Sequence, residues 1–171
     1  MKKILVIGNS GSGKTTFAKE LAEKTGLPLV HLDKIFWCGE WSHISRDEFD
    51  SILKKELQKN EWIIDGDFSR TLPYRLKYAD TVFYLDLPTI TCLWGATVRV
   101  LKNFGKTRID MGGNCPERFD KHKINLYKAI ISYNKLRRTE CYKMLSEQSN
   151  IEIIIFKSRR QISSYLKNIK K

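Results

Sequence analysis

The sequence is poor in the residues that build disulfide frameworks and metal clusters. It has four cysteines and three histidines among 171 residues. The cysteines lie far apart and form no C-x-x-C pair, which is atypical of zinc sites and of secreted, disulfide-bonded scaffolds. Cysteines that stay reduced are typical of the cytoplasm, so we expect a cytoplasmic protein.

Long apolar runs are also missing. No stretch approaches the roughly 18 apolar residues that cross a membrane, so we expect no membrane partner. The N-terminus enters a predicted strand at once, which predicts neither a signal peptide nor a transit peptide. The sequence shows no repeat and no linker, and its 171 residues predict a single domain over residues 1–171. We expect that domain to be a monomer or a dimer.

Acidic residues are few beside the basic ones. The chain has 31 Lys and Arg against 19 Asp and Glu, a formal net charge of +12. Such a balance favours polyanionic ligands, and nucleic acid is one candidate. The basic residues are spread along the chain rather than gathered in a patch interleaved with aromatics. This distribution favours a phosphorylated small molecule over nucleic acid as the partner.

The strongest motif lies near the N-terminus. Eight residues match the phosphate-binding pattern G-x-x-x-x-G-K-[ST], namely Gly8, Asn9, Ser10, Gly11, Ser12, Gly13, Lys14 and Thr15. An apolar run precedes them and a helical spacing follows, which is the context that distinguishes this motif from a plain turn. We expect the loop and the helix start, including Thr16, to bind the phosphates of ATP. Lys14 would contact the transferred phosphate, and the Thr15 hydroxyl would bind Mg²⁺.

Apolar runs alternate with helical patterns along the chain, which predicts an α/β fold with a parallel sheet and helices on both faces. Strands are expected at residues 3–7, 29–32, 62–64, 81–85 and 151–156. Helices are expected at residues 14–24, 46–59, 88–103, 120–148 and 159–168. Periodicity disappears between residues 104 and 119, and a loop of that length favours a lid or a binding segment.

Aspartates follow three of the predicted strands, where ligands bind in doubly wound sheets. Asp65 ends an apolar run, the pattern of a carboxylate that holds Mg²⁺ directly or through water. Asp86 is the alternative metal residue, although Pro88 favours its opening the next helix. Asp33 would bind the acceptor or take its proton, and the alternative role is a helix N-cap.

Basic side chains clamp a transferring phosphoryl group, and several arginines are placed for this role. Arg70 follows the strand that ends at Asp65 and is expected to bind the acceptor. Trp37 and Trp41 would stack on a flat acceptor or pack together. The other candidates are Arg75, Arg99, Arg108, Arg118, Arg137 and Arg138, and surface ion pairing is the alternative for each.

Together these residues resemble the small P-loop kinases of the nucleoside monophosphate kinase and shikimate kinase group. Within it the sequence is most similar to the adenylate-kinase-like family labelled "DNA topology modulation protein", related to FlaR. The likeness also rests on His31-Leu32-Asp33, Trp62-Ile63-Ile64-Asp65-Gly66, Ser69-Arg70-Thr71, Tyr84-Leu85-Asp86-Leu87-Pro88 and Cys115-Pro116-Glu117-Arg118-Phe119. It implies a three-layer fold with a five-stranded sheet, a lid at about residues 104–119 and an acceptor-binding region at about residues 33–61.

The resemblance implies an ATP-binding phosphotransferase that uses Mg²⁺ and passes the γ-phosphate to a small nucleotide or metabolite. Its catalytic residues would be Lys14, Asp33, Arg118 and Arg138, the last from an R-x-x-x-Y pattern after the lid, with Arg108 on the nucleotide. Adenylate kinases run D-G-F-P-R where this chain has Asp65-Gly66-Asp67-Phe68-Ser69-Arg70, so AMP is not the expected acceptor. The family label leaves open a nucleotide-binding regulatory protein associated with DNA, although no DNA-reading motif is recognisable.

Overall fold

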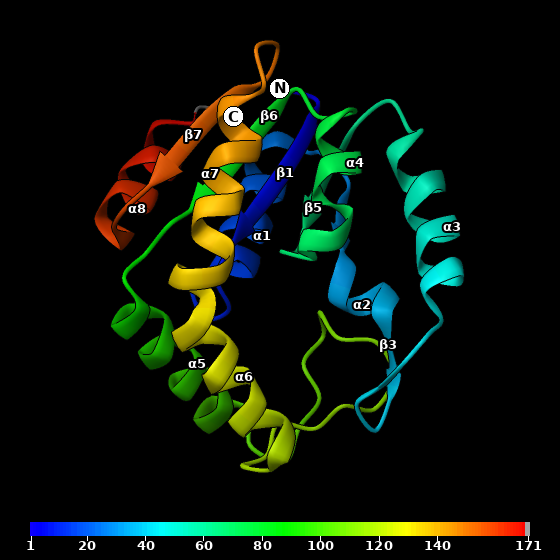
Figure 1. Ribbon diagram of the computed structural model, residues 1–171, viewed down its shortest axis with the longest axis vertical. Helices are drawn as coiled ribbons and strands as arrows, with labels where there is room; N and C mark the ends of the chain where they lie inside the picture. The colour runs from blue at the N-terminus through cyan, green and yellow to red at the C-terminus, as the bar shows by residue number, and fades with distance from the viewer. Residues whose placement is uncertain (170–171) are drawn as a thin grey trace.

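A five-stranded parallel sheet forms the centre of the protein, described over residues 1–169 by a computed structural model (Figure 1). The strand order is β2-β5-β1-β6-β7. The strands are β1 (Lys3–Gly8), β2 (Leu29–His31), β5 (Trp62–Asp65), β6 (Thr81–Leu85) and β7 (Glu152–Phe156). The α/β class and the five predicted strands are therefore confirmed.

Helices cover both faces of this sheet because its strands alternate their side chains between two cores. Ile4 and Val6 of β1 pack with α1 (Lys14–Thr25) and α8 (Arg159–Asn168). Leu5 and Ile7 face the opposite core, which contains α3 (Arg46–Leu57), α4 (Leu72–Leu76) and α7 (Thr139–Ser146). Strands buried on both faces are apolar throughout, which is why short runs identified them in the sequence.

The helix predicted over residues 120–148 is divided into three parts. These are α6 (Lys121–Tyr133), the π-helical turn η2 (Asn134–Arg138) and α7. A π turn inserts an extra residue and changes the face that the following helix buries. Within α6, which precedes this turn, Ile130 and Tyr133 are buried whereas Ile124 and Ile131 are exposed.

Short elements that sequence periodicity did not detect follow β2 and β5. After β2 come α2 (Leu32–Phe36) and a hairpin of β3 (Trp37–Gly39) and β4 (Ser42–His43). After β5 come the 3₁₀ turn η1 (Ser69–Thr71) and α4. Elements of two to five residues are too short to show a hydrophobic period.

The aperiodic segment at residues 104–119 links α5 (Thr89–Lys102) to α6 and reaches across to the β3–β4 hairpin (Figure 1). Glu40 N donates to Asn114 O at 2.7 Å, and the Trp41 indole donates to Pro116 O at 3.3 Å. A Cβ atom on Gly112 would lie 1.9 Å from Trp37 O, so this approach requires glycine. The 104–119 segment and the β3–β4 hairpin thus contact each other beyond the carboxyl edge of the sheet and close the chain into a ring there. Within residues 1–169, no helix is long and apolar enough to cross a membrane.

Candidate functional site

The glycine-rich loop joins β1 to α1 at the carboxyl edge of the sheet. Gly13 is the N-cap of α1, with φ of 96°, and no side chain caps the helix. The first N–H groups of α1 are therefore available to an anion. The Lys14 ammonium donates to Asn9 O at 3.0 Å and so lies folded over the loop. Gly11 allows α5 to approach closely, because a Cβ atom there would lie 2.0 Å from Cys92 O.

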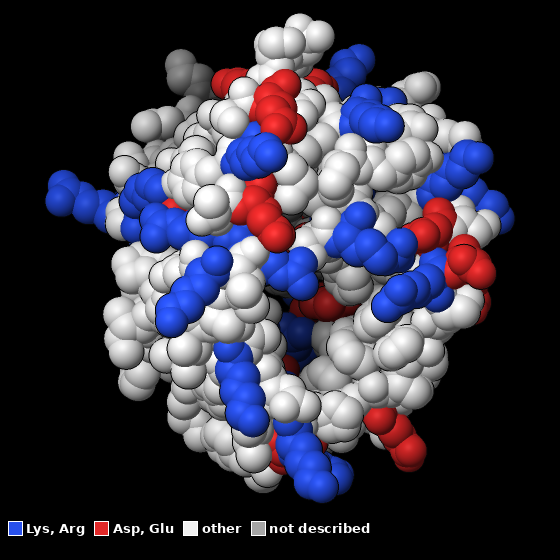
Figure 2. Space-filling model, in the orientation of Figure 1, with Lys and Arg blue, Asp and Glu red and all other residues white. Residues whose placement is uncertain are grey.

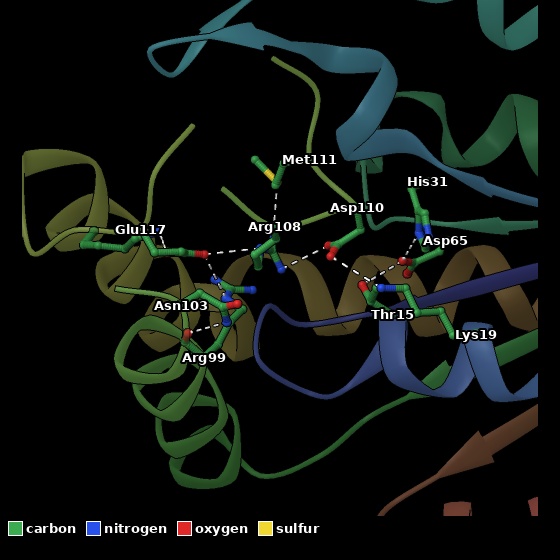
Figure 3. Close-up of polar contacts among 11 residues, drawn as sticks. Thr15, Lys19, His31, Asp65, Arg99, Asn103, Arg108, Asp110, Met111 and Glu117 are labelled. Atoms are coloured by element: carbon green, nitrogen blue, oxygen red, sulfur yellow. Dashed lines mark hydrogen bonds and ion pairs between the residues drawn. The ribbon is translucent and has the colours of Figure 1, made fainter. Parts of the chain in front are cut away.

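Thr15 and Asp65 meet beside this loop (Figure 3). The Thr15 hydroxyl donates to Asp65 Oδ2 at 2.7 Å, and His31 Nδ1 lies 3.0 Å from the same oxygen. Adjacent parallel strands bring the residues together, since Asp65 is paired in register with Val6 of β1. Asp65 Oδ1 is buried and has no hydrogen-bond partner among the described residues.

A cavity of about 900 Å³ lies over the loop. On the face drawn in Figure 2 the molecule is hollowed near its centre, and both basic and acidic side chains lie at the opening. The residues that line the cavity include Ser10, Gly11, Ser12, Gly13, Lys14, Thr15, Thr16, Lys19, Asp33, Asp65, Asp67, Trp94, Arg99, Arg108, Asp110 and Arg159. The cavity therefore joins the glycine loop to residues from α2, from α5 and from the 104–119 segment.

Asp33 lies in the first turn of α2 and lines this cavity. The N-cap of α2 is His31 and not Asp33, so the capping role considered from the sequence is wrong. Burial raises the pKa of the Asp33 carboxyl above its ordinary value, and nearby Arg108 and Lys14 partly offset this effect. A carboxylate with a raised pKa, facing a cavity, is suited to accept a proton.

Facing the loop, a chain of charged side chains lies along the 104–119 segment (Figure 3). Arg108 Nη1 lies 3.1 Å from Asp110 Oδ2, and its Nε lies 3.3 Å from Glu117 Oε1. Arg99 Nε lies 3.5 Å from the same Glu117 oxygen, and Lys19 Nζ lies 3.7 Å from Asp110 Oδ1. Arg99 and Arg108 were candidates from the sequence. Sequence reasoning missed Lys19, Asp110 and Glu117 because charged residues in a loop and on a helix surface usually face solvent.

Comparisons with known proteins show which proteins the chain resembles. A family model described as isopentenyl transferase matches residues 1–71, which contain the glycine loop, Asp33 and Asp65. A putative adenylate kinase from Pyrococcus abyssi is 35% identical over 80 residues, covering 43% of this chain and 44% of that protein. An adenylate kinase from Thermotoga neapolitana is 30% identical over 80 residues, covering 47% and 36%. The chain thus spans less than half the length of these curated relatives.

A solved shikimate kinase from Acinetobacter baumannii, in complex with shikimate, has a similar structure with a TM-score of 0.60. The match covers 98% of this chain and 92% of that one, at 16% sequence identity. The fold is a P-loop kinase fold. Together with the partial sequence matches, it supports placing the chain in a P-loop kinase-like group.

Three residues expected to bind the acceptor do not line the cavity of this P-loop kinase fold. Arg70 is exposed and pairs with Asp50 through two hydrogen bonds of 2.8 and 2.6 Å. The Trp37 and Trp41 rings pack edge to face at 5.4 Å. The hairpin turn, where Trp41 has φ of 57°, directs Trp41 toward the 104–119 segment and onto His122. In this conformation Arg70 forms a surface ion pair, Trp41 packs against the 104–119 segment and the start of α6, and none of the three side chains faces the cavity.

Three further arginines also lie outside the cavity. Arg118 is exposed. Arg138, in η2, donates to Asp86 Oδ2 at 2.8 Å. Arg75 is buried and donates to three carbonyls of the loop after β5, those of Gly66, Asp67 and Phe68, at 2.9 to 3.0 Å. Burial lowers the pKa of Arg75 to about 10. Arg75 therefore supports the chain that carries Asp65 and Asp67.

Asp86, the alternative metal residue, is occupied by other partners. Burial alone would raise the pKa of Asp86, but hydrogen bonds from Lys157, Tyr142 and Arg138 bring it below the ordinary value. Asp86 does not line the cavity, and it neither contacts Thr15 nor opens α5, whose N-cap is Pro88. The geometry thus favours Asp65 over Asp86 as the partner of Thr15.

Proposed function

We propose that this protein is an ATP-dependent phosphotransferase that transfers the γ-phosphate of ATP to a small nucleotide or metabolite. One observation carries the proposal. The glycine loop, the Thr15–Asp65 pair, Asp33 and three arginines line one cavity of about 900 Å³. That volume is at the upper end of the range of small-molecule sites, roughly 300–1,000 Å³, which suits two ligands side by side. We also place the protein nearest to the adenylate-kinase-like, FlaR-related group that its motifs resemble.

The nucleotide would bind with its phosphates in the glycine loop. The uncapped N-terminus of α1 provides N–H donors and the positive end of the helix dipole. Lys14, which now donates to Asn9 O, would turn its ammonium to the β- and γ-phosphates. A lysine that already lies over the loop needs only a side-chain rotation to do so.

Thr15 and Asp65 would hold Mg²⁺. The unpartnered Asp65 Oδ1 fits this role, because a buried carboxylate oxygen without a donor is suited to a cation or to its bound water. The ion would neutralise charge on the phosphates and orient them. His31 would keep Asp65 in place through its 3.0 Å contact.

Asp33 would orient the acceptor and take its proton as the phosphoryl group is transferred. Arg99 and Arg108 would stabilise the negative charge that spreads over that group. Arg118, Arg138, Arg70, Trp37 and Trp41 would join the site only after rearrangement of the segments that carry them. The proposed site therefore depends first on Lys14, Thr15, Asp33, Asp65, Arg99 and Arg108.

The test is a search for the acceptor. ADP release would be measured with Mg²⁺·ATP and a panel of nucleotides and small hydroxylated metabolites, and products would be analysed by mass spectrometry. An acceptor that accelerates ADP release and gains one phosphoryl group supports the proposal. If ADP release gives only inorganic phosphate with every acceptor, the protein is an ATPase, as expected of a nucleotide-binding regulatory protein.

A further inference from the structure

Glu117 is a fully buried carboxylate of the 104–119 segment, with 0% of its surface accessible, and it directly precedes the exposed Arg118. It does not line the nucleotide cavity. Three cationic side chains surround it, from three different places in the chain: Arg99 of α5, Arg108 of the segment and Lys123 of α6. Two of these cations line the cavity, so Glu117 lies directly behind the cavity wall (Figure 3).

The two arginines turn the same edge toward Glu117. In both residues the nearest nitrogen is Nε, at 3.5 Å for Arg99 and 3.3 Å for Arg108, and both contact Oε1. A guanidinium group is a rigid planar fork, so fixing its Nε edge also fixes the direction of Nη1 and Nη2. The Nη atoms of Arg99 form no hydrogen bond or ion pair with the part of the chain described. They remain available to a ligand in the cavity.

The other oxygen and the backbone of Glu117 hold the carboxylate in place. Oε2 pairs with Lys123, itself buried in the first turn of α6. Glu117 N donates to Lys106 O at 3.0 Å, and Gly105 N donates to Glu117 O at 2.9 Å. These bonds tie the two ends of the segment together. Glu117 is thus anchored independently of the arginines.

The charges of Arg99 and Arg108 indicate what the Glu117 carboxylate does. Burial lowers the pKa of Arg99, the nearby charge of Arg108 lowers it further, and Glu117 acts in the opposite direction. Two guanidinium groups that line one cavity repel each other, and without a shared counter-charge they would turn apart toward solvent. A carboxylate between them offsets this repulsion and leaves the Nη atoms of Arg99 free, whereas Nη1 of Arg108 contacts Asp110 and its Nη2 donates to the Met111 sulfur.

We propose that Glu117 is a positioning residue that holds the guanidinium groups of Arg99 and Arg108 in the cavity wall, facing the phosphates of a bound nucleoside triphosphate. The inference rests on the proposed function. Glu117 does not itself touch the ligand. Its effect on phosphate binding passes through the two arginines.

The experiment measures binding of inorganic tripolyphosphate by calorimetry, because this probe tests the phosphate site without a base or an acceptor. Glu117→Gln should weaken binding about tenfold, equivalent to about 1.4 kcal/mol. The matched control, Glu61→Gln, alters an exposed carboxylate just before β5 and should leave the affinity unchanged. Lys14→Ala tests the phosphate site itself and should weaken binding strongly.

A double-mutant comparison separates positioning from a general effect on structure. In an Arg99→Met/Arg108→Met background, adding Glu117→Gln should change the affinity less than twofold, a difference of about 0.4 kcal/mol. A full tenfold loss in that background would overturn the inference. So would wild-type affinity in Glu117→Gln beside a weakened Lys14→Ala.

Two further outcomes are distinguishable. Wild-type affinity in Lys14→Ala would reject the proposed nucleotide site rather than the role of Glu117 alone. If Glu117→Gln does not fold, as judged by thermal unfolding, Glu117→Asp retains the charge but shortens the reach. Its affinity should fall measurably, and unchanged affinity would overturn the inference.

Discussion

The Thr15 hydroxyl donates to the Asp65 carboxylate at 2.7 Å, although the two residues are 50 positions apart in the sequence. The contact exists because β1 and β5 are neighbours in the sheet, so the loop that follows β1 and the last residue of β5 meet at the same edge. A hydroxyl and a carboxylate that converge beside a phosphate loop form a site suited to Mg²⁺.

The first prediction concerns this pair. Asp65→Asn keeps the size of the side chain but removes its charge, so the Mg²⁺ dependence of ATP turnover should shift to higher concentrations by about 10- to 100-fold. A magnesium titration of turnover measures the shift. Asp86→Asn is the matched control and should leave the Mg²⁺ dependence unchanged.

The control variant, Asp86→Asn, should change the pH dependence of stability. Because the pKa of Asp86 is lowered in the fold, its ionised form stabilises the native state above its ordinary pKa, and this stabilisation is lost as the pH falls through the lowered value. Asp86→Asn should therefore lower the melting temperature at pH 7, and this effect should shrink as the pH falls from the ordinary pKa toward the lowered value. If Asp86→Asn rather than Asp65→Asn altered the Mg²⁺ dependence, the metal site would have to be reassigned.

The second prediction concerns Lys14. Lys14→Ala should leave the fold intact and lower ATP turnover by about 10²-fold or more, because a preorganised cation on the transferred phosphate is removed. Circular dichroism and steady-state kinetics measure the two effects. Lys54→Ala, an exposed lysine on α3, is the control. Wild-type turnover in Lys14→Ala would rule out the assigned role.

The third prediction separates the activity of Asp33 from its effect on stability. Asp33→Asn should reduce phosphoryl transfer while leaving ATP affinity nearly unchanged. In the wild type we expect transfer to fall at acid pH as Asp33 becomes protonated, and the variant should lack this fall. Pre-steady-state transfer, measured against pH with the identified acceptor, tests this. Loss of ATP binding in the variant would place Asp33 in the nucleotide site instead.

Asp33→Asn should increase the stability of the fold although it reduces phosphoryl transfer. The pKa of Asp33 is raised in the fold, so its contribution to stability is greatest at low pH and is lost as the pH rises through the raised value. As the pH rises through the raised pKa the ionised carboxylate destabilises the fold, so Asp33→Asn should raise the melting temperature toward neutral pH. The difference should disappear below about pH 4, near the unperturbed pKa. A variant that is less stable at pH 7 would contradict the prediction.

The fourth prediction is structural. Arg75→Met should reduce the free energy of unfolding by about 3 kcal/mol or more, because the carbonyls of Gly66, Asp67 and Phe68 lose their donor in a buried site. Urea denaturation measures the change. Arg70→Met is the matched control from the same region, and its exposed ion pair should contribute less than about 1 kcal/mol. Similar losses in both variants would contradict the assigned role of Arg75.

The fifth prediction concerns the 104–119 segment as a lid. Hydrogen exchange in this segment should slow when a non-hydrolysable ATP analogue binds. Gly112→Ala should speed exchange there in the free protein, because the added Cβ would lie 1.9 Å from Trp37 O. Gly105→Asn is the control, since Asn tolerates its φ of 72° and a Cβ there meets no atom within 4 Å. Unchanged exchange at saturating nucleotide would indicate a fixed structural loop.

The sequence alone was sufficient for the fold class, the five strands and the glycine loop. Each of these depends on local information: apolar runs mark buried strands, and the loop needs glycine, lysine and threonine at set spacings. The carboxylates at the ends of β2 and β5 could also be placed, since every parallel strand ends at the same edge. The short elements after those strands and the π turn at Asn134–Arg138 left no periodic signal.

Only the tertiary structure decided which charged residues face the cavity. Six arginines that are indistinguishable as cations in the sequence have different places in the fold. Arg99 and Arg108 line the cavity. Arg70 pairs at the surface, Arg75 supports a loop, Arg118 is exposed and Arg138 binds Asp86. Glu117 carried no signal, because its burial depends on Arg99, Arg108 and Lys123 arriving from separate elements. The physical reason is the distance along the chain over which each kind of interaction acts. Backbone and hydrophobic preferences act between near neighbours in the chain, whereas the partner of a charge is set by packing across the whole fold.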